Sequence, residues 1–164
     1  MLCGASRPGH FRGVTTVVSK LLGIVRPHIA AFGAKDLQQV LVIKKMVRDL
    51  SINTEIEVVP TVRESDGLAM STRNGYLSHD ERALAPLFSR TLEETAKRVA
   101  ESGSDIKTVI AEGEAILTEA GFVVDYLEAR HTYDLSEASS LNQETALFGA
   151  AFLGTTRLID NRIV

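Results

Sequence analysis

The spacing of apolar residues between positions 13 and 60 constrains the fold of this chain most. In residues 13–25 the apolar positions follow the i, i+3, i+4 pattern of an amphipathic helix, which Pro27 ends. The same reasoning predicts the next elements: a strand at 28–33, a helix at 36–50 and a strand at 54–60. This order predicts a parallel sheet with right-handed crossovers, as in part of a doubly wound α/β domain. The residues before position 13 are predicted to form a loop.

The pattern changes after Pro60. Ser78 and Glu81 form the S-x-x-E capping box of a long helix, and Gly121 suits the position just after another helix. The predicted elements are helices at 78–101 and 105–120, separated by "SGS" at 102–104, and strands at 122–131, 146–154 and 156–164. Polar turns between these strands favour an antiparallel sheet. We therefore expect a domain boundary near residue 62, with part of an α/β domain at 1–61 and a small α+β domain at 62–164.

Composition excludes several classes of protein. The chain has 164 residues, a formal net charge of −3 and a pI of about 5.8, without the basic face typical of nucleic-acid binding. Its apolar runs are shorter than the roughly 18 residues of a membrane-spanning helix, and it does not open with a signal peptide. The single cysteine, Cys3, allows no internal disulfide, and Cys3 with His10 is too little for a metal site. These features predict a cytoplasmic protein that binds neither nucleic acid nor membrane and holds no metal of its own.

The segment "FGAKDLQQ" (32–39) is the first candidate site. It joins the end of a predicted strand to the start of a helix, where ligands bind in open α/β sheets. Gly33 would let the backbone approach a ligand, Lys35 would attract a phosphate, and Asp36 would accept hydrogen bonds from ribose hydroxyls. Gln39 offers a donor and an acceptor to a polar substrate. The alternative, which this motif alone favours, is a plain connection with an exposed lysine and an N-cap aspartate.

The segment "DGLAMSTRNGYLS" (66–78) is the second candidate site. Arg73 supplies a planar, permanently charged group suited to phosphate oxygens, and Ser71 and Thr72 add hydroxyl donors. Met70 is flexible and polarisable, so it can lie against a flat base. The alternative is a solvated polar turn with an incidental arginine, and this segment alone does not decide between the two.

The remaining polar positions give weaker signals. Arg7 and His10 in "RPGHF" precede a helix, and a histidine there can act as an acid or base, although a lone histidine is more often structural. Val62, just past the second strand, could touch a base, but a linker is the simpler explanation. The other candidates show no informative spacing and are assigned to the surface or to packing: Tyr126, Glu128, His131 and Asp160.

Taken together, these segments resemble one family, pantothenate synthetase, also called pantoate–β-alanine ligase. The resemblance covers essentially the whole chain and rests on four segments: "RPGHFRGVTTVVSKLL", "AFGAKDLQQ", "VPTVRESDGLAMSTRNGYLS" and "RLIDNRIV". It implies a Rossmann-like domain of the nucleotidyl-transferring superfamily that includes class I aminoacyl-tRNA synthetases, followed by a small α+β domain. It also implies a homodimeric cytoplasmic ligase.

The resemblance implies a reaction in two steps. Pantoate attacks the α-phosphate of ATP, which binds with Mg²⁺, giving pantoyl adenylate and pyrophosphate; the amine of β-alanine then displaces AMP to give pantothenate. By position, Lys35 and Arg73 would stabilise phosphate charge, Gln39 would bind pantoate, and Arg7 would lie near the active site. The residues implied for ATP binding are Gly33, Ala34, Lys35, Asp36, Val62, Met70, Ser71, Thr72 and Arg73.

The chain departs from the family pattern in three respects. Thr72 stands where a second serine is usual, and Ala34 stands where Glu or Gln is common. The strand and H-x-G-H turn of the family, with its proposed catalytic histidine, are absent from this sequence, and His10 belongs to a different motif. We therefore expect the C-terminal part of a synthetase with little activity alone. The alternatives are another adenylyl-transferring enzyme and a non-catalytic nucleotide-binding or subunit-interaction module.

Overall fold

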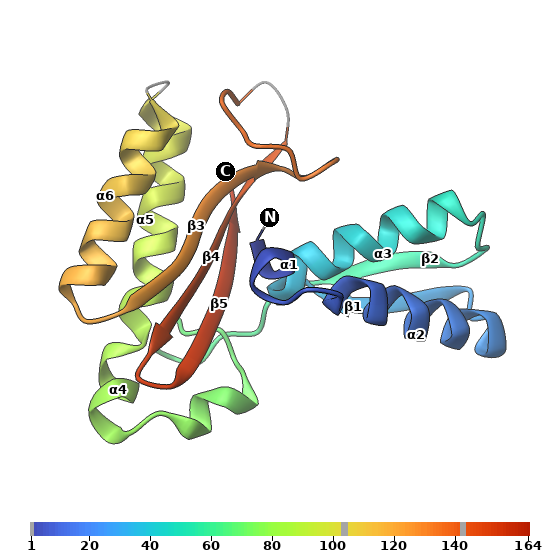
Figure 1. Ribbon diagram of the computed structural model, residues 1–164, viewed down its shortest axis with the longest axis horizontal. Helices are drawn as coiled ribbons and strands as arrows, with labels where there is room; N and C mark the ends of the chain where they lie inside the picture. Colours follow the sequence, from blue (N-terminus) through green and yellow to red (C-terminus); the bar gives the residue numbers. More distant parts are fainter. Residues whose placement is uncertain (1, 103–104, 142–143) are drawn as a thin grey trace. The chain divides into compact units, whose positions relative to one another are not determined.

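The parallel α/β arrangement predicted for the first part of the chain is confirmed. A computed structural model describes residues 2–102, 105–141 and 144–164. The chain divides into two compact units, 1–61 and 62–164. Unit 1 contains α1 (Leu2–Ser6), α2 (His10–Val25), β1 (Ile29–Gly33), the 3₁₀ helix η1 (Ala34–Asp36), α3 (Leu37–Asp49) and β2 (Glu55–Val59). The strands pair in parallel from Ile29 opposite Glu55 to Gly33 opposite Val59, and α2 and α3 run alongside them (Figure 1).

Unit 1 packs one face of its small sheet against α2 and α3, and the strand residues on that face are half-buried. The core joins this face to α2 and α3 through Leu22, Ile43, Met46, Ala30, Phe32 and Ile56. Residues alternate across a strand, so Ile29 and Val59 lie on the opposite face, where both are exposed. Helix α2 also exposes an apolar row: Val17, Leu21, Ile24 and Val25.

The loop predicted before position 13 is wrong. Residues 2–6 form α1, and α2 begins at His10. The Cys3 N–H donates to the Gln38 Oε1 at 3.1 Å, a link between distant residues that local sequence does not reveal. Gly9 takes φ +78° just before α2, a conformation that glycine adopts without strain.

Unit 2 confirms the predicted antiparallel sheet. Its elements are η2 (Thr72–Tyr76), α4 (His79–Leu84), α5 (Pro86–Ser102), α6 (Ile106–Glu119), β3 (Val123–His131), β4 (Thr145–Leu153) and β5 (Thr156–Ile163). The strands pair in the order β3-β4-β5, and α5 and α6 lie side by side against the sheet (Figure 1). Gly149 permits this packing, because a Cβ there would come within 2.9 Å of the Leu92 side chain.

The ends of the helices in unit 2 follow local chemistry. Ser78 and Glu81 form the predicted capping box, and Gly121 takes φ +95° after α6. The single helix predicted at 78–101 is wrong, since it divides at Ala85 into α4 and α5. Pro86 explains the division, because proline lacks an N–H and begins a helix better than it continues one. Residues 103–104 of the predicted "SGS" break lie outside the described residues.

No helix within the described ranges is both long enough and apolar enough to cross a membrane.

Candidate functional site

The segment around Lys35 lies where the sequence predicts, at the carboxyl end of β1. Gly33 is exposed, and a Cβ there would meet no atom within 4 Å, so the backbone is open to a ligand. Lys35 is half-buried in η1. Asp36 occupies the N-cap position of α3, but its side chain makes no capping hydrogen bond and is exposed. The prediction that Asp36 stands at the N-cap position is confirmed, but no capping hydrogen bond occupies its carboxylate, which lies exposed at the end of the strand.

The two adjacent glutamines of α3 have different environments. Gln38 is buried and accepts the hydrogen bond from the Cys3 N–H. Gln39 is half-buried and lines an open groove of about 650 Å³. The other residues of this groove are Pro8, Gly9, His10, Gly13, Val14, Val17 and Val18. Unit 1 therefore places one amide side chain beside a largely apolar surface.

His10 brings a neutral imidazole to the same groove. Its Nε2 lies 3.2 Å from Nη1 of Arg7, and because arginine can only donate, Nε2 accepts and the proton resides on Nδ1. Burial lowers the pKa of His10, the Arg7 charge lowers it further, and Asp36 opposes both. His10 is therefore mainly uncharged at neutral pH, and Arg7 is joined to the groove through it.

The second candidate segment begins within a short hairpin in unit 2. The Met70 N–H donates to the Val62 carbonyl at 2.9 Å, and the Leu68 carbonyl accepts from the Glu64 N–H at 2.8 Å. Gly67, with φ +88°, forms the turn. We refer to residues 62–70 as the hairpin. It places Val62 and Met70, both more than half exposed, opposite each other at its base.

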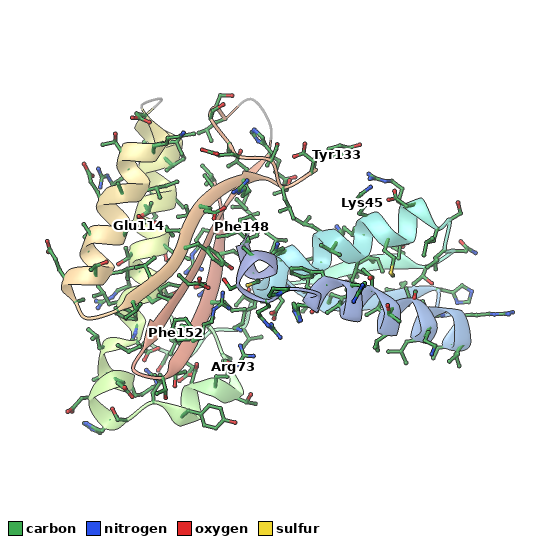
Figure 2. The ribbon with its side chains drawn as sticks, in the orientation of Figure 1. Lys45, Arg73, Glu114, Tyr133, Phe148 and Phe152 are labelled. Atoms are coloured by element: carbon green, nitrogen blue, oxygen red, sulfur yellow. The ribbon has the colours of Figure 1, made fainter. Side chains whose placement is uncertain are left out.

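Ser71, Thr72 and Arg73 leave the hairpin as a polar turn. The Ser71 Oγ accepts from the Arg73 N–H at 3.2 Å and so caps η2, while its own hydroxyl proton remains able to donate. Thr72 and Arg73 are exposed, and Figure 2 labels the Arg73 side chain. The turn therefore offers two hydroxyls and a guanidinium on one short segment.

Two polar side chains that were expected at the surface or in packing, Asp160 and His131, are buried, and Asp160 contacts the hairpin. Asp160 is buried in β5, which agrees with a packing role, and it accepts from both terminal nitrogens of Arg63, at 2.8 and 3.0 Å. His131 is also buried, with its Nδ1 3.2 Å from the Thr145 hydroxyl. Strand periodicity could have predicted the burial of Asp160, because Asp160 lies on the same face of β5 as the buried Leu158.

Acid should loosen the hairpin. Hydrogen bonds from Asn74 and then Arg82 hold the pKa of Glu64 below its ordinary value, and Arg82 does the same for the pKa of Asp66. Because folding lowers these pKa values, both carboxylates stabilise the hairpin at neutral pH. That contribution is lost as the pH falls below the ordinary pKa values of these carboxyl groups and through their lower folded-state values. The Leu68 amide, which donates to Asp66 at 3.1 Å, should lose protection from hydrogen exchange there.

The control is the double variant Glu64→Gln, Asp66→Asn, which should show a flatter dependence on pH. Equal protection of the Leu68 amide in the original chain at neutral and acid pH, after correction for intrinsic exchange rates, would contradict the expectation.

Comparison with solved structures gives the class of protein. The chain superimposes on pantothenate synthetase from Thermus thermophilus with a TM-score of 0.91 and 43% identity, covering 99% of this chain and 59% of that one. It superimposes on the pantoate-beta-alanine ligase of Francisella tularensis, complexed with beta-gamma ATP and beta-alanine, with a TM-score of 0.72 and 34% identity. That match covers 99% of this chain and 54% of that one. The chain therefore has the α/β fold of the matched part of these ligases.

Sequence comparison gives the family. A sequence model of pantoate-beta-alanine ligase matches residues 1–163, and the chain belongs to that family, as its four motifs indicated. It is 56% identical over 160 residues to pantothenate synthetase of Shewanella sediminis and 52% identical over 160 residues to that of Pseudomonas entomophila. Both matches cover 98% of this chain, which spans 57% and 56% of the two relatives.

Proposed function

We propose that this chain supplies part of the active site of an enzyme that condenses pantoate with β-alanine through a pantoyl adenylate. The observation that carries the proposal is the exposed Ser71–Thr72–Arg73 turn, in a chain that the family model matches along 1–163. The Francisella relative, complexed with beta-gamma ATP and beta-alanine, supports ATP and β-alanine as ligands. The products are pantothenate, AMP and pyrophosphate.

In the first step, a pantoate carboxylate oxygen attacks the α-phosphorus of ATP and pyrophosphate leaves. Lys35 and Arg73 neutralise negative charge on the phosphates, and the Ser71 and Thr72 hydroxyls donate to phosphate oxygens. Mg²⁺ enters with ATP as part of the substrate; among the described residues no group of three or more His, Cys, Asp or Glu side chains is placed to hold a metal ion. The protein thus acts by positioning and charge neutralisation.

The nucleoside and pantoate are held by the remaining residues. The exposed Asp36 carboxylate accepts from the ribose hydroxyls, the backbone of Gly33 and Ala34 borders the nucleotide, and Val62 and Met70 pack near adenine. Pantoate carries two methyl groups and two hydroxyls. The valine-lined groove beside Gln39 matches that pattern of apolar and polar groups, and Arg7 borders it through His10. In the second step, the β-alanine amine attacks the acyl carbon and AMP leaves.

The test uses a hybrid enzyme. The part of the Shewanella sediminis synthetase that this chain does not match is joined to this chain, and pantothenate formation from pantoate, β-alanine and Mg-ATP is measured. We expect product to depend on all three substrates. A folded hybrid that makes no pantothenate, beside an active Shewanella enzyme, would contradict the proposal. The family resemblance also supports a cytoplasmic homodimer, which sedimentation of the hybrid tests.

Substitutions of Thr72 should separate the effect of the hydroxyl from that of the methyl group. Thr72→Ser keeps the hydroxyl and should leave pyrophosphate release nearly unchanged. Thr72→Ala removes a neutral donor, worth about 0.5–1.5 kcal/mol, and should slow pyrophosphate release by roughly two- to tenfold. Rapid-quench measurement on the hybrid checks both. Equal slowing in the two variants would show that the methyl group, rather than the hydroxyl, matters.

A further inference from the structure

A buried carboxylate joins the hairpin to the last strand of unit 2. The Asp160 side chain on β5 is 1% exposed, and Arg63, the second residue of the hairpin, donates to both of its oxygens. The two residues lie 97 positions apart in the sequence. Paired hydrogen bonds between planar groups fix orientation as well as distance, so this contact sets how the hairpin sits on the sheet.

Further donors complete the environment of Asp160. Arg162 Nη1 lies 3.0 Å from Oδ2, and the Asn161 N–H donates to Oδ1 at 2.9 Å. The Ser89 hydroxyl on α5 lies 2.9 Å from both Asp160 Oδ2 and the Gly67 carbonyl, either of which can accept its proton. Arg63 also donates to the Gly67 carbonyl at 3.1 Å. The turn of the hairpin is therefore held by the same cluster as its base.

A second set of bonds fixes the residue that follows Arg73. The Asn74 side-chain amide donates to Glu64 Oε1 at 2.6 Å and to the Ala69 carbonyl at 3.1 Å. Arg82 donates to the other oxygen of Glu64 and, at 2.7 Å, to Asp66. The Ser71–Thr72–Arg73 turn is thus held before its first residue by the hairpin and after its last by Asn74, while Thr72 and Arg73 stay exposed.

We propose that Asp160 and Arg63 are positioning residues for adenylation, which hold the Ser71–Thr72–Arg73 turn in the orientation that meets the phosphates. This inference rests on the proposed function. A buried ion pair is costly to form from hydrated charges, and removing one partner leaves the other buried and unpaired. Misplacing a group near a reacting centre by about an ångström can slow a reaction by roughly a hundredfold. The position of the turn should therefore affect the rate of adenylation directly.

The kinetic test is Asp160→Asn in the hybrid. Pyrophosphate release should slow by about tenfold or more, and the conversion of preformed pantoyl adenylate with β-alanine should stay within about twofold of the original rate. Arg63→Lys should act in the same direction, because lysine keeps the charge but cannot make the paired contact. Equal loss in both steps, or no change in pyrophosphate release, would overturn the positioning role.

The matched control is Asp125→Asn. Asp125 lies on β3 and pairs with Arg157, which lies on β5, the strand that carries Asp160. Arg157 donates to Asp125 at 2.6 Å and joins β5 to β3 instead of to the hairpin. Both reaction steps should remain within about twofold of the original rates. A selective fall in pyrophosphate release in this control would show that any lost ion pair on β5 has the same effect, and would also overturn the proposal.

Hydrogen exchange on this chain alone, outside the hybrid, tests whether Asp160 holds the hairpin and requires no measurement of activity. In Asp160→Asn, the amides of Glu64, Gly67 and Met70 should exchange at least about tenfold faster while those of β4 are unchanged. Uniform acceleration, or none, would overturn the proposal. If the original hybrid releases no pyrophosphate, the proposed function fails and the positioning role falls with it, even where exchange shows that Asp160 holds the hairpin.

Discussion

Replacing Arg73 by alanine should slow pyrophosphate release by the hybrid about tenfold to more than a hundredfold. A charge-assisted hydrogen bond to phosphate is worth roughly 1.5–3 kcal/mol, and each 1.36 kcal/mol of lost transition-state stabilisation is tenfold in rate. The second step should suffer less, because pyrophosphate has left before β-alanine attacks. Single-turnover measurements of pyrophosphate release and of pantothenate formation from preformed adenylate separate the two effects.

Two further variants sharpen this test. Lys35→Ala should slow the same step, since both cations are proposed to face the phosphates. Arg98→Ala removes an arginine from the surface of unit 2, where Arg98 pairs with Glu112, and should leave both steps unchanged. If Arg73→Ala releases pyrophosphate at the original rate, residues 71–73 are only a polar turn, the alternative that the sequence alone left open.

Replacing Phe88 by alanine should lower the free energy of unfolding of unit 2 by about 3–5 kcal/mol. Phe88 is 1% exposed, and its ring stacks on that of Phe122 with centroids 6.2 Å apart. Removing it leaves a cavity between α5 and the segment that leads into β3. The protection of the β4 amides against hydrogen exchange reports unfolding of this unit and gives the free-energy change directly.

Tyr133→Ala is the matched control for Phe88→Ala. Tyr133, labelled in Figure 2, is 76% exposed, so its removal should change the free energy of unfolding by no more than about 0.5 kcal/mol. Similar losses of β4 protection in the two variants would mean that Phe88 is not part of a cooperative core.

Local chemistry made most of the fold predictable. The parallel and antiparallel sheets followed from the order of elements and from strand alternation, and the ends of helices followed from Ser78, Glu81 and Gly121. The same rules could have predicted that the helix divides at Pro86, but the apolar periodicity continues on both sides of this proline and indicated a single helix. Helix α1 was not predictable, because it is tied by a contact between Cys3 and Gln38.

The candidate site was predictable only as segments. The sequence indicated both turns. It could not show that the Asp36 side chain makes no capping hydrogen bond, or that Gln39 lines the groove while Gln38 is buried. The pairing of Arg63 with Asp160 depends on the complete unit, since residues 97 positions apart meet only after the sheet has formed. Such contacts are set by tertiary packing, and no local pattern specifies them.

If the chain takes part in forming a pantoyl adenylate, as proposed, the hybrid should exchange labelled pyrophosphate into ATP. With the hybrid, pantoate and Mg-ATP, label should enter ATP in the absence of β-alanine, and Arg73→Ala should slow that entry. No labelling by a hybrid that makes pantothenate, or labelling that requires β-alanine, would contradict the account.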